Sequence, residues 1–314
     1  MIYYFCPDIS APSAGIKRLY RHVFHLNRKG LDASILHQKK GFVLIWHGYQ
    51  VPVIWMEDQP ILRAEDILVF PESATGVMQQ TQHYPNTRLV IVLSWAYIFK
   101  NLPEGENWKD YGITQAITPS TYIKEFLEWS MGVTVTLIGD YVAPTRFYPP
   151  SEKKKHKIVY QARRSNVGNL LRGYLEKKGG ALNDYEWTPM INFDEDQYAS
   201  HLREASICLL TSEQEGTPTS ALEGMATGCV VVGYTGIGGS DIMIGEGDNQ
   251  NCVLVENGHL LELGQTLEKV AIDMKQQPGC YDAVIKNAVS TARRFADFEK
   301  EGDSLKRFFE SLSQ

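Results

Sequence analysis

Two glutamates, Glu215 and Glu223, are the side chains best placed to do chemistry in this sequence. A carboxylate accepts hydrogen bonds at two oxygens, so it can bind neighbouring hydroxyls of a sugar. The segment between them begins with Gly216, Thr217, Pro218 and Thr219. A helix is expected to start there, and its free N–H groups and dipole favour phosphate. We therefore expect the segment to bind a sugar, a ribose and the phosphates between them.

A strand, a helix and a second strand are expected to position these glutamates. The apolar run Ile207–Leu210 shows no alternation, which is typical of a strand buried on both faces of a parallel sheet. A helical stretch that includes Leu222 follows and ends at Gly228, before the β-branched run Val230–Val232. In such a unit the helix begins at the carboxyl end of the sheet, where anions and nucleotides bind.

Glu223 also has a structural interpretation. Ser220 and Glu223 have the spacing of a capping box, and Thr217 as cap with Pro218 at the first helical position is equally plausible. Spacing alone therefore favours a capping role for Glu223. Glu215 lies in the loop at the end of a buried strand, where functional side chains concentrate, so its interpretation is functional.

A pair of arginines, Arg163 and Arg164, follows the expected strand Ile158–Tyr160 at a carboxyl end. Guanidinium groups there suit a diphosphate, although a solvated surface pair has the same sequence pattern. The segment Gly236–Gly239 also follows a strand, but it lacks the spacing of a dinucleotide-binding loop. The arginine pair is therefore the candidate phosphate ligand.

No metal site is expected. Asp194–Asp196 resembles a metal-binding DxD pattern, but it precedes a helix, where carboxylates interact favourably with the dipole. His22 and His25 are three residues apart on an expected helix and are interpreted as exposed or partly packed.

The composition is that of an ordinary globular protein, with 43% hydrophobic and 22% charged residues. The net charge of −6 argues against a general nucleic-acid binder. Five scattered cysteines predict buried free thiols in a reducing compartment. The longest apolar stretch, Leu89–Phe99, is too short to span a bilayer. We expect a cytoplasmic protein, and peripheral contact with the inner face of a membrane stays open.

The chain is expected to fold as two α/β domains, because its 314 residues exceed one typical core. Residues 1–150 form the first domain, and a composition shift that includes Lys153–Lys155 marks its end. Residues 151–285 restart the α/β rhythm as the second domain. Residues 286–314 belong to a final helix that is a candidate to cross back to the first domain.

Three local predictions can be compared with the structure. Phe42–Trp46 and Val51–Trp55 predict a hairpin inserted in the first domain. Ser120 or Thr121 is the expected cap of a helix. A single helix is expected over 282–312.

One family signature matches the glutamate segment. Glu215-Gly216-x-Pro218, followed by Leu222-Glu223 and the stretch to Val231, resembles the paired-glutamate motif of GT-B-fold retaining glycosyltransferases of family 4. Further similarities lie at Pro119-Ser120, Ile138–Pro149, Gly15 and Gly238-Gly239. The resemblance extends over nearly the whole chain and implies two doubly wound Rossmann-like domains that face each other across a cleft.

The resemblance also implies roles for individual residues. Glu215 would hold donor-sugar hydroxyls, and Glu223 the ribose of the nucleotide. The backbone from Gly216 to Thr219 would face the diphosphate, with Arg163 or Arg164 neutralising the leaving phosphate. The loop around Met190 and Ile191 would meet the base. Gly15 would lie on the substrate side of the first domain. No divalent metal and no cofactor would be required.

The function implied is a retaining hexosyltransferase. It would move a hexose from a nucleotide sugar, UDP-linked rather than GDP-linked, to a saccharide or lipid-linked acceptor, as in surface polysaccharide synthesis. Two features depart from the family: no lysine lies between Arg164 and Gly168, and Ser94-Trp95 stands where a histidine is frequent. A sugar-nucleotide epimerase of the same fold and a degenerate binding or scaffold subunit therefore remain alternatives. The sequence assigns no oligomeric state.

Overall fold

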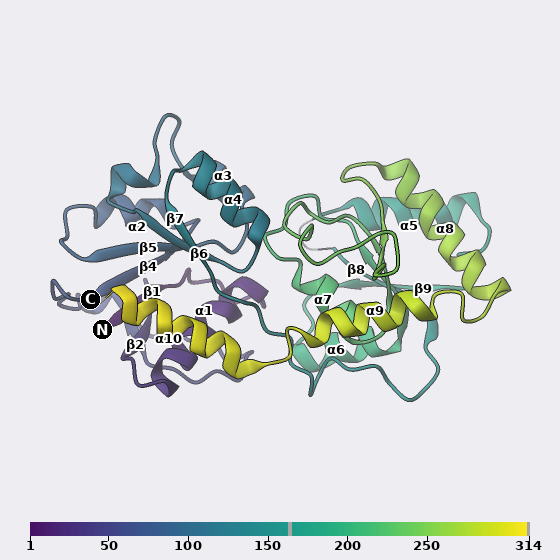
Figure 1. The fold of residues 1–314 in the computed structure, drawn as a ribbon, viewed down its shortest axis with the longest axis horizontal. Helices are drawn as coiled ribbons and strands as arrows, with labels where there is room; N and C mark the ends of the chain where they lie inside the picture. The colour runs from purple at the N-terminus through teal and green to yellow at the C-terminus, as the bar shows by residue number, and fades with distance from the viewer. Residues whose placement is uncertain (163–164, 313–314) are drawn as a thin grey trace. The chain divides into compact units, whose positions relative to one another are not determined.

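The computed structural model describes residues 1–162 and 165–312. The chain divides into two compact units, and each is built around its own parallel sheet (Figure 1). Unit 1 comprises Met1–Asp140 together with Phe298–Gln314, and unit 2 comprises Tyr141–Asp297. The break after Asp140 precedes the composition shift near residue 150.

Unit 1 contains a sheet of seven strands within the described residues, in the order β3-β2-β1-β4-β5-β6-β7. The strands are β1 (Ile2–Phe5), β2 (Ala33–His37), β3 (Val53–Trp55), β4 (Ile67–Pro71), β5 (Thr87–Ile91), β6 (Gln115–Thr118) and β7 (Thr134–Leu137). All neighbouring strands in this order are parallel, so their carboxyl ends lie along one edge of the sheet.

Helices cover both faces of this sheet. They are α1 (Ala14–Arg28), α2 (Thr75–Gln80), α3 (Ala96–Asn101), α4 (Thr121–Ser130) and α10 (Phe298–Leu312), with the short 3₁₀ turns η1 (Met56–Asp58) and η2 (Trp108–Tyr111). Neighbouring side chains of β1 point to opposite faces. Tyr4 packs with α1 and α10, whereas Tyr3 and Phe5 pack with α2 and α4. The sheet is therefore buried on both sides.

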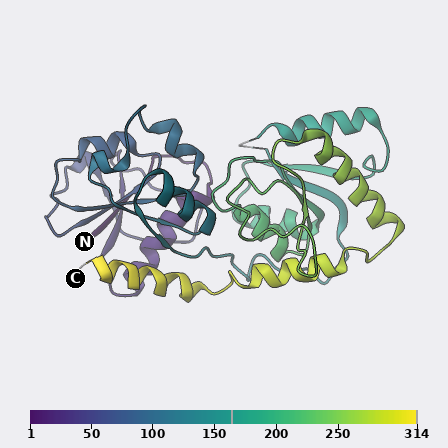
Figure 2. The ribbon, with the colours of Figure 1, turned by 45° about the horizontal axis from the view of Figure 1, so that its top comes forward.

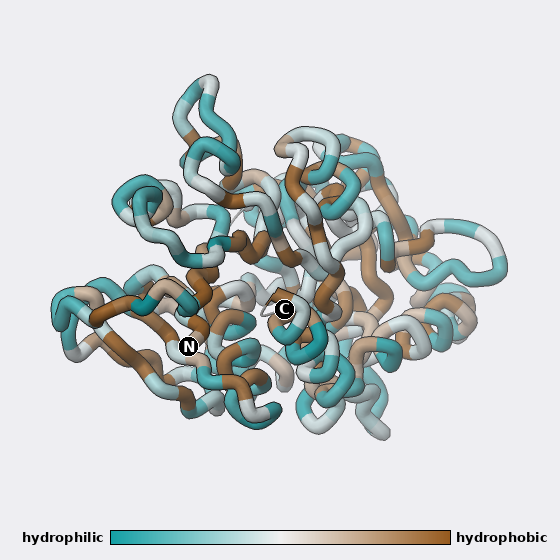
Figure 3. Tube along the Cα trace, turned by 60° about the vertical axis from the view of Figure 1, so that its left-hand side comes forward, coloured by the Kyte–Doolittle hydropathy of each residue, from teal (hydrophilic) through white to brown (hydrophobic). Residues whose placement is uncertain are grey.

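Unit 2 contains five parallel strands within its described residues, in the order β12-β11-β10-β8-β9. The elements are β8 (Lys155–Gln161), α5 (Val167–Lys178), β9 (Glu186–Met190), α6 (Glu195–Glu204), β10 (Ala205–Leu210), α7 (Thr219–Ala226), β11 (Val230–Gly233), β12 (Val253–Leu254), α8 (Leu260–Gln276) and α9 (Asp282–Arg293). One face packs against α6, α7 and α9, and the other against α5 and α8. The hydrophobic stretches, brown in Figure 3, lie mainly inside the units.

The prediction of one helix over 282–312 is wrong, because the chain leaves α9 after Arg293 and begins α10 at Phe298. The break separates two packing environments: α9 belongs to unit 2, whereas α10 lies along α1 of unit 1 (Figures 1 and 2). The apolar face of α10, with Leu305, Phe308 and Phe309, is buried in the core of unit 1.

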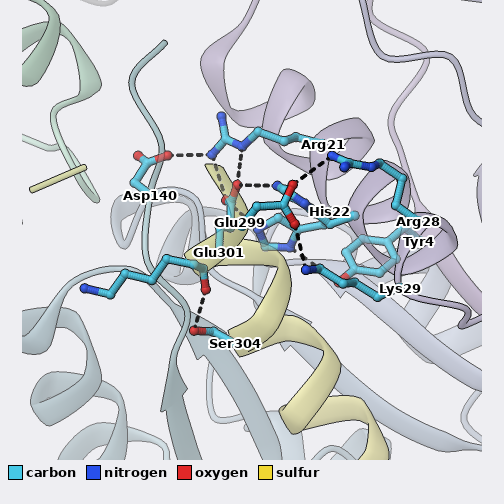
Figure 4. Close-up of polar contacts among 11 residues, drawn as sticks. Tyr4, Arg21, His22, Arg28, Lys29, Asp140, Glu299, Glu301 and Ser304 are labelled. Atoms are coloured by element: carbon cyan, nitrogen blue, oxygen red, sulfur yellow. Dashed lines mark hydrogen bonds and ion pairs between the residues drawn. The ribbon is translucent and has the colours of Figure 1, made fainter. Parts of the chain in front are cut away.

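A buried group of charged side chains joins α10 to α1. We call it the ionic cluster; its members are Arg18, Arg21, His22, His25, Asp140 and Glu301. Figure 4 shows Arg21 between Asp140 and Glu301. The expectation that His22 and His25 are exposed or partly packed is wrong: their side chains are 2% and 0% exposed and face Glu301. The Glu301 carboxylate, which both imidazole rings face, lies near the C-terminal end of the sequence.

The predicted hairpin is also wrong. Residues 42–46, all described by the structure, are not in a strand, and Val53–Trp55 is an edge strand parallel to β2. The cap of α4 is Ser120, whose hydroxyl accepts from the Ile123 N–H at 3.3 Å. Apolar residues and turn glycines do not distinguish a hairpin from a loop that returns to an edge.

The cysteines are free thiols among the described residues, and four of the five are buried, with Cys280 exposed. None of the helices in the described part of the chain is both long enough and apolar enough to cross a bilayer.

Candidate functional site

The candidate site begins where the central strand of unit 2 ends. All six residues of β10 are buried, and the chain then passes through Thr211 into the loop that carries Glu215. Glu215 forms an isolated parallel bridge with Ile237. Its N–H donates to the Gly236 carbonyl at 2.8 Å, and its carbonyl accepts from the Gly238 N–H at 3.3 Å. The backbone of Glu215 is thus held at the carboxyl edge of the sheet.

The glycines of 236–239 permit very close contact with this loop. A Cβ on Gly238 would lie 1.5 Å from the Gly216 carbonyl oxygen, and one on Gly239 would lie 2.8 Å from Pro218 Cγ. No side chain fits at such distances, so these positions require glycine. The segment supports the glutamate loop from behind, which gives its glycines a packing role.

Ile237 adopts an unusual backbone conformation beside Glu215. Its φ angle of +72° lies in the left-handed region, which is a genuine outlier for a β-branched residue. The Ile237 N–H donates to Thr235 Oγ1 at 3.1 Å, which holds the turn. Strained backbone of this kind is concentrated at functional sites.

Helix α7 begins at Thr219, with Pro218 at the N-cap and no capping hydrogen bond from a side chain among the described residues. Both capping predictions are therefore wrong: Ser220 lies inside the helix, and Thr217 does not cap it. The Pro218 carbonyl accepts from the Ala221 N–H at 2.8 Å, which closes the first turn with a backbone bond. Glu223 therefore does not form a capping box with Ser220.

Two hydroxyls next to this helix start are buried and have no hydrogen-bond partner among the described residues, Thr211 Oγ1 and Thr217 Oγ1. A buried hydroxyl without a partner costs about 1–3 kcal/mol, so such groups usually have a use. Both hydroxyls can donate hydrogen bonds to an anion. Both belong to the loop before α7, where the helix dipole favours negative charge. The local chemistry fits a phosphate.

Glu223 lies on α7. This helix packs closely on β10, so that a Cβ on Gly224 would lie 2.9 Å from the side chain of Cys208. The side chain of Glu223 lies near the buried Tyr198 hydroxyl of α6. Burial raises the pKa of that hydroxyl well above its usual value, and the negative charge of Glu223 raises it further. Gln161, the last residue of β8, donates from Nε2 to Tyr198 Oη at 2.9 Å.

Met190 and Ile191 lie at the carboxyl end of β9. Gln161 is the register partner of Met190, and β8 separates β9 from β10. Two strand spacings, about 10 Å, therefore lie between the ends of β9 and β10. Met190 is buried in the core, whereas Ile191 is 41% exposed. Only Ile191 of this pair offers its side chain to a ligand.

Three of the remaining candidates cannot be placed with these residues. Arg163 and Arg164 lie outside the described residues. Gly15 belongs to unit 1, where it lies in the first turn of α1 rather than before the helix, and a Cβ there would lie 3.0 Å from Leu93 Cδ1.

The acidic segment Asp194–Asp196 has the structural role expected for it. Asp194 caps α6 and forms a capping box with Gln197. Arg146 pairs with Glu195 at 2.8 Å and with Asp196 at 2.9 Å. The described residues contain no group of three or more His, Cys, Asp or Glu side chains arranged to hold a metal ion.

Sequence reasoning missed Tyr198, Gln161 and Thr211. Tyr198 is two residues beyond Asp196 on a helix interpreted only through its acidic start, and no local pattern links it to Glu223. Thr211 carries a weak signal, because it directly follows the buried strand at the functional edge of the sheet.

The sequence is similar to that of known glycosyltransferases. Residues 154–273 match the family model described as glycosyl transferases group 1. A curated relative, an alpha-1,6-glucosyltransferase of Actinobacillus pleuropneumoniae serotype 7 (strain AP76), is 24% identical over 229 residues, which is 68% of this chain and 67% of the relative. The segment 154–273 that matches the family model contains Glu215, Glu223 and the arginine pair.

Solved structures establish the fold as GT-B. Sucrose-phosphate synthase of Thermosynechococcus elongatus superposes with a TM-score of 0.73 at 14% identity, over 99% of this chain and 98% of that one. Anabaena Alr3699/HepE in complex with UDP-glucose superposes with a TM-score of 0.72 at 12% identity, over 99% and 100%. The chain thus consists of two Rossmann-like domains of the GT-B class.

Proposed function

We propose that this protein is a metal-independent, retaining glycosyltransferase of family 4 that transfers a hexose from a UDP-sugar to a saccharide or lipid-linked acceptor. The observation that carries the proposal is the position of Glu215. Its backbone is held at the carboxyl end of β10, next to the start of α7, inside the segment that matches glycosyl transferases group 1.

Each part of the donor has a matching group in the site. The Glu215 carboxylate accepts from hexose hydroxyls, and the Glu223 carboxylate accepts from ribose hydroxyls. The backbone from Gly216 to Thr219 faces the diphosphate, together with the hydroxyls of Thr211 and Thr217, which have no partner among the described residues. Ile191 provides the exposed apolar side chain against the base.

The chemistry proposed is stabilisation of the leaving group. The bond between the hexose anomeric carbon and the diphosphate oxygen breaks, and a bond to the acceptor oxygen forms on the same face. The acceptor hydroxyl proton passes to the leaving phosphate oxygen. Negative charge grows on the diphosphate in the transition state, where the start of α7, Arg163 and Arg164 stabilise it.

The choice of donor follows from chemistry and from the relatives together. The curated relative is named a glucosyltransferase, and a structural neighbour is held in complex with UDP-glucose. We extend both to this chain, with UDP-glucose as the first donor to test. Surface polysaccharide synthesis is the role we propose for the transfer.

The full-length protein is incubated with UDP-glucose and a panel of saccharide acceptors, and the product is examined by NMR. We expect UDP release that depends on acceptor and an α-glucoside, the configuration of the donor. A β-glucoside would contradict retention. An epimerised nucleotide sugar formed without acceptor would replace the proposal by an epimerase, and absence of any binding to nucleotide sugars would replace it by a scaffold role.

A further inference from the structure

Unit 1 contains a pocket at the point where its sheet reverses strand order. The chain adds β2 and β3 on one side of β1 and then places β4 on the other side (Figure 1). It leaves β1 for α1 on one face of the sheet and β4 for α2 on the other. Ligands of open α/β sheets bind in the crevice that such diverging loops create. A cavity of about 300 Å³ lies there, and its lining includes Asp8 after β1, Gln38 after β2 and Ser73 after β4. We call it the unit 1 pocket.

The lining of the unit 1 pocket combines apolar surface with hydrogen-bonding side chains. Phe5, Met56 and Val77 supply apolar surface, and the exposed residues Gln38 and Gln80 supply amides. A sugar ring presents C–H faces and hydroxyl edges, so it needs both kinds of surface. The volume lies at the lower end of the usual range for ligand pockets, about 300–1,000 Å³, which suits one sugar ring rather than a whole nucleotide sugar.

Three donors hold the Asp8 carboxylate at this pocket. Its Oδ1 accepts from His37 Nδ1 at 2.9 Å and from the Gln38 N–H at 3.2 Å. Its Oδ2 accepts from the Lys39 N–H at 2.8 Å. The side chain is nevertheless 21% exposed. Because each carboxylate oxygen accepts about two hydrogen bonds, Oδ2 keeps one position for a ligand hydroxyl.

The orientation of His37 is fixed in turn by its neighbours. Nδ1 lies 2.9 Å from Asp8 Oδ1 and 3.1 Å from the Cys6 carbonyl oxygen, and both oxygens only accept, so Nδ1 carries the proton. Burial lowers the pKa of His37, although Asp8 opposes the shift. The neutral ring therefore accepts at Nε2 from the Tyr20 hydroxyl, 2.7 Å away. This chain of side chains orients the Asp8 carboxylate before a ligand binds, which reduces the entropy that binding must lose.

The charge of Asp8 makes the unit 1 pocket selective among sugars. The lining residues, all of them described by the structure, include no lysine, arginine or histidine. A carboxylate or phosphate on a ligand would therefore meet the negative charge of Asp8 without a cation beside it, and like charges repel most in partly buried sites. An uncharged sugar instead donates a hydroxyl to Asp8.

We propose that the unit 1 pocket binds one sugar ring of the acceptor and that Asp8 restricts this sugar to an uncharged one. The inference rests on the proposed function, because it takes a glycosyl acceptor as the second substrate of the reaction. The groups assigned to the donor belong to unit 2 and the pocket belongs to unit 1, so each substrate has its own binding residues. Asp8 is a binding residue that accepts a hydroxyl of the acceptor sugar.

The test uses two matched pairs of ligands, methyl glucoside with methyl glucuronide and methyl galactoside with methyl galacturonide. The members of a pair differ only in a hydroxymethyl group or a carboxylate at C6. Saturation-transfer NMR titrations measure their affinity for the full-length protein in the presence of UDP. We expect at least one neutral glycoside to bind about tenfold or more tightly than its uronide.

Asp8→Asn retains the size of the side chain and removes its charge. We expect this variant to bind the neutral glycoside about 5–10-fold more weakly, as for loss of one hydrogen bond to a charged group, and to lose the discrimination against the uronide. In turnover, the acceptor KM should rise by the same factor while the donor KM stays unchanged.

Gly76→Leu tests the pocket independently of Asp8 and covers the case in which Asp8→Asn fails to fold. Gly76 lines the pocket, and nothing lies within 4 Å of a Cβ added there, so the larger side chain is accommodated by the backbone. We expect it to weaken binding of the neutral glycoside about tenfold. Gly173→Leu is the matched control, because the same change on α5 of unit 2 also has nothing within 4 Å of its Cβ. The control should bind the glycoside like the wild type, and all three variants should keep wild-type affinity for UDP.

Equal affinity of the wild type for a neutral glycoside and its uronide would overturn the inference. Unchanged glycoside binding in both Asp8→Asn and Gly76→Leu would overturn it as well. A wild type that binds UDP and transfers the hexose but binds neither neutral glycoside would overturn it and leave the proposed function standing. Failure of the wild type to bind UDP would instead overturn the proposed function, and the acceptor role of the pocket with it.

Discussion

Arg21 Nε donates to Glu301 Oε2 at 2.6 Å, although 280 residues separate the two in the sequence. The same guanidinium donates from Nη2 to Asp140 Oδ1 at 2.6 Å (Figure 4). Asp140 is the last residue before the chain leaves unit 1, and Glu301 lies in the first turn of α10 after it returns. One buried side chain therefore fixes both points at which the chain crosses between units.

Glu301→Gln should destabilise unit 1 by about 3 kcal/mol, because removal of one charge leaves Arg21 buried without its full complement of partners. Chemical denaturation followed by fluorescence measures the loss. Glu299→Gln is the matched control on the same helix: its side chain is 48% exposed, so solvent screens its pairs with Arg28 and Lys29 and the loss should be much smaller. Equal effects of the two substitutions would show that the ionic cluster does not anchor α10.

The ionic cluster should also make the protein less stable in acid. Burial would raise the pKa of Glu301, but Arg21 and the adjacent His22 and His25 rings hold that pKa well below its usual range. The contribution of Glu301 to the free energy of unfolding is fully present above its pKa in the unfolded state, about 4.3. It is lost as the pH falls through its pKa in the folded state. Burial lowers the pKa of His22, so its contribution is complete above about 6.5 and declines as the pH falls below that value.

The free energy of unfolding, measured at pH 7, 5.5 and 4, tests this direction of the pH dependence. We expect the unfolding free energy to fall at each step, and His22→Gln to remove part of the fall between pH 7 and 5.5. A protein equally stable at pH 7 and 5.5, with no difference between wild type and His22→Gln, would contradict the account of His22.

Gly238→Ala should displace the glutamate loop, since the new Cβ would lie 1.5 Å from the Gly216 carbonyl oxygen. We expect a cost of about 1–3 kcal/mol in stability and a fall in UDP-sugar affinity, measured by thermal shift with and without ligand. Gly173→Ala provides the control, because nothing lies within 4 Å of its added Cβ on α5 and it should stabilise by about 0.4–1 kcal/mol. Unaltered ligand binding in Gly238→Ala would show that this contact does not shape the site.

Much of the sheet framework could be predicted from local pattern. Continuous apolar runs such as Ile207–Leu210 indicate strands buried on both faces, and β10 occupies that stretch. The carboxyl-end position of Glu215 followed from the same reasoning. Parallel α/β units repeat one physical requirement, burial of a strand between two helix layers, so their sequences carry it locally.

The relationships that the sequence did not reveal are those between distant residues. His22 and His25 carry no sign that a carboxylate at position 301 faces them. The charge of Glu223 on α7 acts on the buried Tyr198 of α6, and a polar residue on a helix gives no indication of such a neighbour. The capping predictions for α7 failed for a related reason. The turn at Pro218 sets the start of that helix, so Ser220 lies inside it.

The most direct test of the central claim replaces one of two glutamates in the same loop. Glu215→Ala removes the carboxylate proposed to hold the donor hexose, and Glu213→Ala removes an exposed carboxylate two residues away. Turnover of UDP-glucose with acceptor is measured for both, alongside UDP affinity. We predict that Glu215→Ala lowers turnover at least about 100-fold while it still binds UDP, and that Glu213→Ala matches the wild type. Wild-type turnover in Glu215→Ala would contradict the proposed site.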